Sequence, residues 1–210
     1  MSVLEYVKNS VIKGDDEQVV KDVNMAIDMK EDPISIINNG LIAGMNVVGS
    51  RFKAEEMFVP EVLMSAQAMA AGVEVVQPLI KEGDITNKGT IVLGTVKGDL
   101  HDIGKKLVAI MFDSNGYNVV DIGFDVPAEK FVEAVKEHNA QIVGLSALLT
   151  TTMPEMKTVI DTLKGAGLRD KVKVIIGGAP VTEEFSEEIG ADGYSPDAGS
   201  ATQLADRLLA

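Results

Sequence analysis

Apolar positions in the first part of the chain recur at intervals of three and four residues. This spacing runs over residues 3–81 and lacks the alternation that a half-buried strand requires. Residues typical of helix ends divide the region at Gly14, at Asp32-Pro33 and at Pro60. The pattern therefore predicts an all-α domain of four helices. The fourth is expected over 59–79, and its many alanines favour close helix packing.

The hydrophobic pattern changes after a polar segment with two glycines, residues 81–89, which we expect to be a linker. From there on, short apolar runs alternate with amphipathic helical segments. The predicted strands are 90–95, 117–122, 141–146, 172–177 and a short one near 192–194, and the predicted helices are 102–114, 127–138, 153–165, 182–189 and 197–209.

These runs are apolar along their length, as is typical of a parallel sheet that helices cover on both faces. Five such strands joined by helices predict an α/β fold, a flavodoxin-like (Rossmann-like) doubly wound parallel five-stranded sheet. We therefore expect two domains, a helical one with its linker over residues 1–87 and an α/β one over residues 88–210.

Charge restricts the class of partner. The chain has 19 Lys and Arg against 32 Asp and Glu, a formal net charge of −13, which disfavours nucleic acid and anionic membranes. No apolar stretch approaches the roughly 20 residues that span a bilayer, and the N-terminus lacks a signal-peptide pattern. We therefore expect a cytoplasmic protein.

The scarcity of metal-binding side chains restricts the chemistry further. The chain has no cysteine and two histidines, His101 and His138, so disulfides, thiolate nucleophiles and sites with several imidazoles are excluded. A transition-metal site would rest on one imidazole with carboxylates, or on a cofactor that brings its own metal. His138 ends a polar helix and is expected to be solvated there.

The loop after the first predicted strand, Gly98-Asp99-Leu100-His101-Asp102-Ile103-Gly104, is the main candidate for chemistry. Its two glycines are separated by five residues rather than four, and Lys105 is followed by lysine rather than Ser or Thr, which excludes a phosphate-binding P-loop. Two alternatives stay open on these residues alone. Asp99, His101 and Asp102 could hold a metal ion, or His101 could simply cap the following helix.

The motifs at the strand ends resemble a known family. Asp99-x-His101-x-x-Gly104, then Ser146-x-Leu148, then Gly177-Gly178 resemble the cobalamin-binding signature, and residues 98–105 are similar to its methyl-carrying branch. The N-terminal part, with Met57-Phe58-Val59-Pro60-Glu61-Val62, resembles the helical cap of cobalamin-dependent methionine synthase and of small corrinoid proteins of methanogens and acetogens. The resemblance spans nearly the whole chain.

The resemblance implies a corrinoid methyl carrier rather than an autonomous enzyme. Its cofactor would be cobalamin or a related corrinoid, alternating between methylcob(III)alamin and cob(I)alamin, with cobalt ligated by His101. A substrate-specific methyltransferase would supply the methyl group, and an acceptor methyltransferase would pass it to a thiol or tetrahydrofolate. A reductive activation protein would be the third partner. The methyl donor is not named by the sequence and could be a methylamine, methanol, glycine betaine or a methoxylated aromatic.

The resemblance also assigns roles to residues. Asp99 would orient His101, and Thr152, where methionine synthase has serine, would extend this relay. The further residues expected to contact the cofactor lie in the strand-end loops and in the cap: Gly98, Asp102, Ile103, Gly104, Ser146, Leu148, Thr150, Gly177 and Gly178 around the lower face and tail, and Phe52, Val59 and Val62 over the upper face. The glycines would leave room for the tail.

Three other functions remain as alternatives. A cobalamin-dependent isomerase subunit would share the Asp-x-His-x-x-Gly loop, although the helical cap argues against it. A cobalamin-based sensor would share cap and fold but needs a DNA-binding segment, for which the chain has no basic stretch. A flavodoxin-like module that binds no cobalamin is the third.

Overall fold

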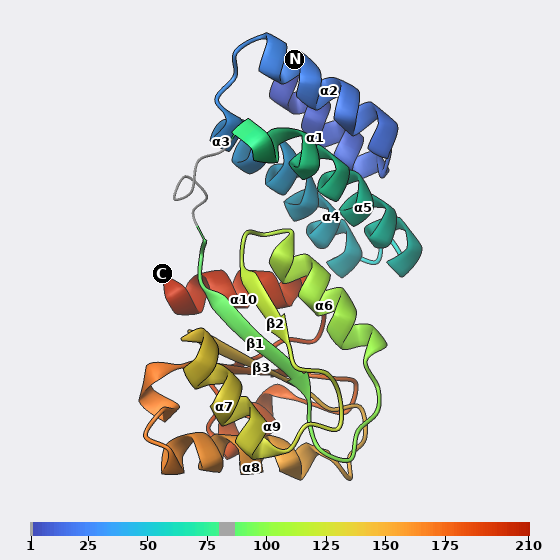
Figure 1. Cartoon of the computed structure of the whole chain (residues 1–210). Coiled ribbons are helices and arrows are strands. Elements are labelled where there is room, and N and C mark those ends of the chain that lie inside the picture. The colour runs from blue at the N-terminus through green and yellow to red at the C-terminus, as the bar shows by residue number, and fades with distance from the viewer. Residues whose placement is uncertain (1, 80–86) are drawn as a thin grey trace. The chain divides into compact units, whose positions relative to one another are not determined.

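The computed structural model of the chain describes residues 2–79 and 87–210 (Figure 1). It divides into two compact units, one of residues 1–86 with the turn 114–116, and one of residues 87–113 with 117–210. Most of the predicted linker, residues 81–86, lies outside the described residues. Each unit is described separately below.

The first unit is helical throughout its described elements. Side-chain caps begin three of its helical segments: Ser2, Asp15 and Asp32 each accept a backbone N–H three residues on. Its elements are α1 (Val3–Lys13), α2 (Asp16–Asp28), α3 (Pro33–Ser35), the π-helix η1 (Ile36–Ile42), α4 (Ala43–Lys53), α5 (Val59–Val76) and the 3₁₀-helix η2 (Gln77–Leu79).

The third predicted helix is a continuous helical run that contains a π-helical stretch, 36–42. Apolar periodicity does not reveal this, because π and α turns place residues four apart on nearly the same face. The run packs closely on α1. A Cβ at Gly40 would lie 2.9 Å from Cγ1 of Val7, and one at Gly44 would lie 2.8 Å from Cβ of Val11.

The fourth helix corrects one expectation. Val59–Leu79 is long and apolar enough to cross a membrane by length and composition alone, so the statement that no stretch approaches that length was wrong. Glu61 and Glu74 interrupt its apolar residues, so it is not an unbroken apolar run, although its mean hydropathy is high. In the structure this helix packs within the first unit: a Cβ at Gly72 would lie 2.6 Å from Leu41 and 2.7 Å from Val19.

The second unit contains a five-stranded parallel sheet in the order β2-β1-β3-β4-β5. This is the flavodoxin-like order, so the predicted fold class is confirmed. The strands are β1 (Thr90–Thr95), β2 (Asn118–Asp121), β3 (Ile142–Ser146), β4 (Lys173–Gly177) and β5 (Gly193–Tyr194). The helices are α6 (Ile103–Asp113), α7 (Ala128–His138), α8 (Met153–Gly165), the 3₁₀-helix η3 (Arg169–Lys171), α9 (Glu183–Ile189) and α10 (Ala198–Leu209).

Helices cover both faces of this sheet (Figure 1). Successive strand residues point to opposite faces: Val92 and Val143 pack in the core under α7, α8 and α9, whereas Ile91 and Ile142 pack under α6 and α10. The strands are therefore apolar on both faces, which explains their unbroken hydrophobic runs.

The register of the central strands decides which loops meet at the carboxyl edge of the sheet. Thr95 pairs with Ser146, and Ser146 pairs with Gly177. The loops that follow β1, β3 and β4 consequently begin side by side.

Candidate functional site

A completely buried carboxylate joins the loop after β1 to the loop after β3. Oδ2 of Asp99 accepts the backbone N–H groups of Leu148 at 2.7 Å and Leu149 at 3.2 Å. The hydroxyl of Thr152, at the start of α8, lies 2.9 Å from the same oxygen and 2.9 Å from the carbonyl oxygen of Leu149. Asp99 and Thr152, predicted to be neighbours, are therefore in contact.

The other oxygen of Asp99 holds His101. Oδ1 lies 2.7 Å from the imidazole Nδ1 and accepts the backbone N–H of His101 at 3.1 Å. The His101 side chain is 51% exposed, whereas that of Asp99 is 0% exposed. Because a carboxylate only accepts hydrogen bonds, Nδ1 carries the proton, and the lone pair of Nε2 is left to bind a ligand.

The charge state of Asp99 follows from these contacts. Burial by itself raises the pKa of the carboxyl, but hydrogen bonds from the Leu148 N–H, from His101 and from Thr152 together outweigh it and hold the pKa at about 2. Asp99 is thus a carboxylate at neutral pH. A buried anion that orients an imidazole is the usual support of a metal-ligating histidine.

The geometry of the loop supports neither a metal ion held by Asp99, His101 and Asp102 nor a helix cap formed by the His101 side chain. The carboxylate of Asp102 pairs with Lys106 at 2.6 Å, which lowers its pKa. In the part of the chain that the structure describes, no group of three or more His, Cys, Asp or Glu is arranged to hold a metal ion. The imidazole of His101 contacts Asp99 rather than a helix end, while its carbonyl accepts the Thr95 hydroxyl at 2.9 Å.

The glycines at this edge have different roles. At Gly104 a Cβ would meet nothing within 4 Å, which leaves open space beside the start of α6. A Cβ at Gly178 would lie 1.9 Å from the carbonyl oxygen of Ala147, and one at Gly177 would lie 3.0 Å from that of Ser195. The protein's own backbone therefore requires glycine at 178 and leaves little room for a side chain at 177, whereas both were expected to clear space for a cofactor tail.

An apolar rim surrounds this edge of the sheet. The exposed large apolar side chains of the described second unit all lie between the end of a strand and the first turn of the next helix: Leu100 at 66%, Ile103 at 78%, Phe124 at 51% and Leu149 at 41% exposure. Of these, sequence reasoning singled out Ile103 alone. Apolar residues inside polar turns were the available signal, and such a patch marks a binding surface.

The three cap residues predicted to contact a cofactor differ in exposure. Phe52 is half-buried, and Val59 is 37% exposed. Val62 is 0% exposed, among the buried residues of α5, and its contact with a cofactor stays a prediction. The neighbouring Phe58 is 66% exposed and Leu63 is 43% exposed, and neither was among the predicted cofactor contacts.

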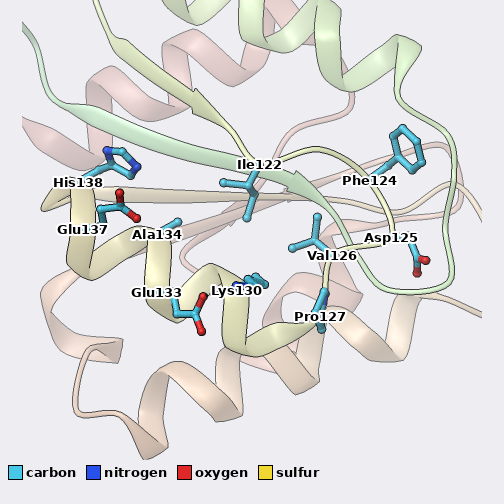
Figure 2. A pocket seen from close by; sticks show the side chains of 10 residues that line it. All are labelled: Ile122, Phe124, Asp125, Val126, Pro127, Lys130, Glu133, Ala134, Glu137 and His138. Carbon is cyan, nitrogen blue, oxygen red and sulfur yellow. Dashed lines mark hydrogen bonds and ion pairs between the residues drawn. The ribbon is translucent and has the colours of Figure 1, made fainter.

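A separate open cavity of about 410 Å³ lies between the loop after β2 and α7 (Figure 2). Its lining includes Phe124 and Asp125 on the loop and Lys130, Glu137 and His138 on the helix. His138, expected to be solvated, thus stands at the edge of a hollow. The lining contains neither Asp99 nor His101, so the cavity is not the site built around them.

Comparison with known proteins identifies the family. A model described as the B12 binding domain matches residues 89–202, and a second model of the same description matches residues 3–77. Both the sheet unit and the helical unit are therefore matched.

Matches to individual proteins agree with these two family matches. A corrinoid protein of Desulfitobacterium hafniense (strain Y51) is 44% identical over 100% of this chain and 98% of its own. Dimethylamine corrinoid protein 1 of Methanosarcina acetivorans is 53% identical over 85% of this chain and 84% of its own. Among solved structures, the methanol:cobalamin methyltransferase complex MtaBC of Methanosarcina barkeri contains a similar chain, with a TM-score of 0.85 and 35% identity over 99% of this chain and 79% of that one.

Proposed function

The chain belongs to the B12 binding domain family and is a corrinoid methyl-carrier protein, and we propose that His101 is its axial cobalt ligand and a methylamine its methyl donor. The observation that carries the ligand assignment is the half-exposed imidazole of His101, whose Nδ1 is bound to the buried Asp99. When bound, the corrinoid supplies the cobalt on which the methyl group is carried.

The residues present fit such a group. A corrin ring brings four in-plane nitrogens, so a single imidazole is enough to complete one axial face, and this loop offers one. The ring is also broad and largely apolar at its edges, which suits the rim formed by Leu100, Ile103 and Leu149. The open space beside Gly104 supports entry of the tail near the start of α6.

We assign Asp99 and Thr152 to the orientation of His101. Asp99 fixes the tautomer that leaves Nε2 unprotonated, and Thr152 with two backbone N–H groups fixes Asp99. The proton shared in this relay lies between Nδ1 of His101 and Oδ1 of Asp99.

The remaining predicted contacts stay part of the proposal. We expect the strand-end residues to surround the lower face and tail, and Phe52, Val59 and Val62, with the exposed Phe58, to contact the upper face. The strand-end set is Gly98, Asp102, Ile103, Gly104, Ser146, Leu148, Thr150, Gly177 and Gly178. The division into a cap over residues 1–87 and a cobalamin-binding domain over residues 88–210 is supported by the two family matches.

The partners follow from the carrier role. Corrinoid proteins work with methyltransferases, as the MtaBC complex illustrates. The methylamine assignment rests on the 53% identity to a dimethylamine corrinoid protein, against 35% to the chain in the methanol complex. An acceptor methyltransferase and a reductive activation protein complete the proposed set. We further propose a cytoplasmic location without nucleic-acid or membrane partners, in keeping with the net charge of −13.

The similar proteins favour the methyl-carrier role over an isomerase subunit or a cobalamin-based sensor, since the two relatives described above are named as corrinoid proteins.

Ligation is tested by electron paramagnetic resonance. The protein is reconstituted with hydroxocobalamin and reduced to the cobalt(II) form, whose spectrum is split by an axial nitrogen. Labelling histidine with ¹⁵N should change the splitting from a triplet to a doublet, and His101→Ala should remove the histidine contribution. His138→Ala is the matched control and should leave the spectrum unchanged. Retention of the ¹⁵N-histidine signal in His101→Ala would contradict the assignment.

The donor is tested with purified methyltransferases for monomethylamine, dimethylamine, trimethylamine and methanol. Each is mixed with the reduced carrier and its ¹³C-methyl donor, and transfer of label to the protein-bound cofactor is followed. We expect the dimethylamine enzyme to transfer fastest. Transfer by the methanol enzyme alone would refute the methylamine assignment without affecting the carrier role.

A further inference from the structure

The loop after β2 fastens the His101 loop through one residue, Asp125. Its Oδ1 accepts the backbone N–H of Gly98 at 2.7 Å, and its own backbone N–H donates to the carbonyl oxygen of Asp99 at 3.0 Å. Asp125 therefore bonds to the backbone on both sides of the peptide bond between Gly98 and Asp99. Neither contact is local in sequence, since 27 positions separate Gly98 from Asp125.

The backbone of Asp125 is unusual. It has a φ of +54°, in the left-handed region that non-glycine residues seldom adopt. Among the described residues, the other non-glycine positions with positive φ are Lys30, Glu55 and Asn139, and each follows the end of a helix, where this conformation is common. Asp125 instead lies in the loop that enters α7. A sparsely populated conformation of this kind persists where surrounding contacts hold it, often at functional sites.

The end of β2 and the loop that follows it, residues 121–126, also contact the C-terminal end of the His101 loop. Lys105, in the first turn of α6, is 3% exposed and forms an ion pair with Asp121, which also accepts the N–H of Gly123 at 2.9 Å. Ahead of Gly98, the N–H of Val126 donates to the carbonyl of Thr95 at 3.0 Å. The segment 121–126 therefore contacts the chain before and after His101.

We propose that Asp125 is a positioning residue for His101, keeping the loop in the one conformation in which Nε2 can reach an axial metal site. This inference rests on the proposed ligation by His101. Asp99 orients the ring, and bonds from the loop after β3 hold its side chain, but they do not hold the backbone on either side of it. A ligand must be held to a fraction of an ångström, so the backbone of the His101 loop needs an anchor as well. Asp125 provides it from a different strand end, at the edge of the hollow shown in Figure 2.

Three variants separate the hydrogen bond from the backbone conformation. Asp125→Gly removes the acceptor at a backbone conformation that glycine adopts without strain. Asp125→Asn keeps an acceptor oxygen for Gly98 and tolerates positive φ, so it should keep the wild-type ligation of cobalt by histidine. Glu137→Gln is the matched control, because Glu137 is an exposed carboxylate lining the same cavity and lies on α7 rather than in the loop.

The first readout is the nitrogen splitting of the reconstituted cobalt(II) protein. In Asp125→Gly we expect the ratio of histidine-free to histidine-ligated cobalt to rise about fivefold, the effect of losing one hydrogen bond. Asp125→Asn and Glu137→Gln should match the wild type. The second readout needs no cofactor: amide hydrogen exchange at Gly98 should quicken about fivefold in Asp125→Gly, while exchange along β3 stays unchanged.

The outcomes distinguish the two proposals. If wild-type protein shows no histidine splitting, the ligation itself fails, and the positioning role fails with it. If wild-type protein shows the splitting and Asp125→Gly retains it in full, Asp125 is not a positioning residue, whether or not exchange at Gly98 has quickened. A rise in the ratio of histidine-free to histidine-ligated cobalt in Asp125→Gly, with the wild-type ratio in Asp125→Asn, supports the proposal.

Discussion

Each unit of the molecule contains a buried carboxylate that accepts a hydrogen bond from a hydroxyl of a neighbouring element, but the two carboxylates have different surroundings. Asp22, 4% exposed on α2, accepts the hydroxyl of Ser10 on α1 and the amide of Gln18 at 2.8 Å. Asp99, 0% exposed, accepts two backbone N–H groups and the hydroxyl of Thr152.

The difference lies in where each hydrogen-bond network ends. The partners of Asp22 are side chains of α1 and α2, so the network ties two helices together within one unit. The network of Asp99 continues to His101, whose ring is half exposed. Burial of a carboxylate therefore does not by itself mark a functional site. A network that delivers one oriented polar group to the surface does.

The strongest test of this comparison is Asp99→Ala. It leaves the N–H groups of Leu148 and Leu149 and the Nδ1 proton of His101 without their acceptor, and we expect the free energy of unfolding of the second unit to fall by about 4 kcal/mol. Histidine ligation of cobalt should be lost with it. Urea unfolding followed by circular dichroism measures the first effect. Asp161→Ala on α8, which removes an exposed pair with Lys157, is the control. A loss below about 1 kcal/mol would show that the network is not structural.

Acid should weaken the second unit through the same carboxyl. The pKa of Asp99 is lowered from 3.8 to about 2, so its contribution is present in full above the unfolded-state value and disappears as the pH falls through about 2. This contribution of Asp99 to the free energy of unfolding is about 2 kcal/mol. Urea unfolding at a series of pH values from about 6 to about 2 should show this decline, and Asp99→Asn should lack it. An equal decline in both proteins would assign the acid sensitivity to other groups.

Asp22→Ala should have a smaller effect, confined to the first unit. Ser10 keeps the carbonyl of Tyr6 as an acceptor at 2.9 Å, and Gln18 can turn to water, so we expect a loss of about 1.5 kcal/mol in the free energy of unfolding. The nitrogen splitting of the cobalt(II) protein should be unchanged. If the splitting disappeared, the distinction between the two carboxylates would fail.

The smallest expected effect comes from Thr152→Val, which removes the hydroxyl while keeping the shape. Because Leu148 and Leu149 still donate to Asp99, the free energy of unfolding should fall by about 1 kcal/mol and histidine ligation should persist. Thr152→Ser restores the hydroxyl and should behave as the wild type in urea unfolding. A loss in Thr152→Ser with none in Thr152→Val would point to packing of the Thr152 methyl group rather than to the hydrogen bond.

Most of the fold was predictable from local pattern. Strand and helix bounds in the second unit differ from the predicted ones by one residue in nearly every element, because apolar runs and cap residues act over short distances. The π-helical stretch was not predictable, since a change of one residue in the hydrogen-bond spacing hardly alters which residues share a face.

The candidate site was predictable in part. The spacing of Asp99 and His101 within one turn, together with a resemblance to a known motif, predicted their contact with each other and with Thr152. The orientation of Val62 was not predictable, because adjacent positions of α5 differ in whether they face the core or solvent. Asp125 carried no sequence signal, since its contacts lie with a distant loop.

By itself, the sequence determined the order and type of the elements, the parallel sheet and the loop that carries the single candidate ligand. These depend on periodicity, capping and composition, which operate between residues a few positions apart. Tertiary structure alone decided which groups surround the buried carboxylate and which segment fastens its loop. Those contacts join positions as far apart as 53 residues, and they form because strand register places loops of different strands side by side.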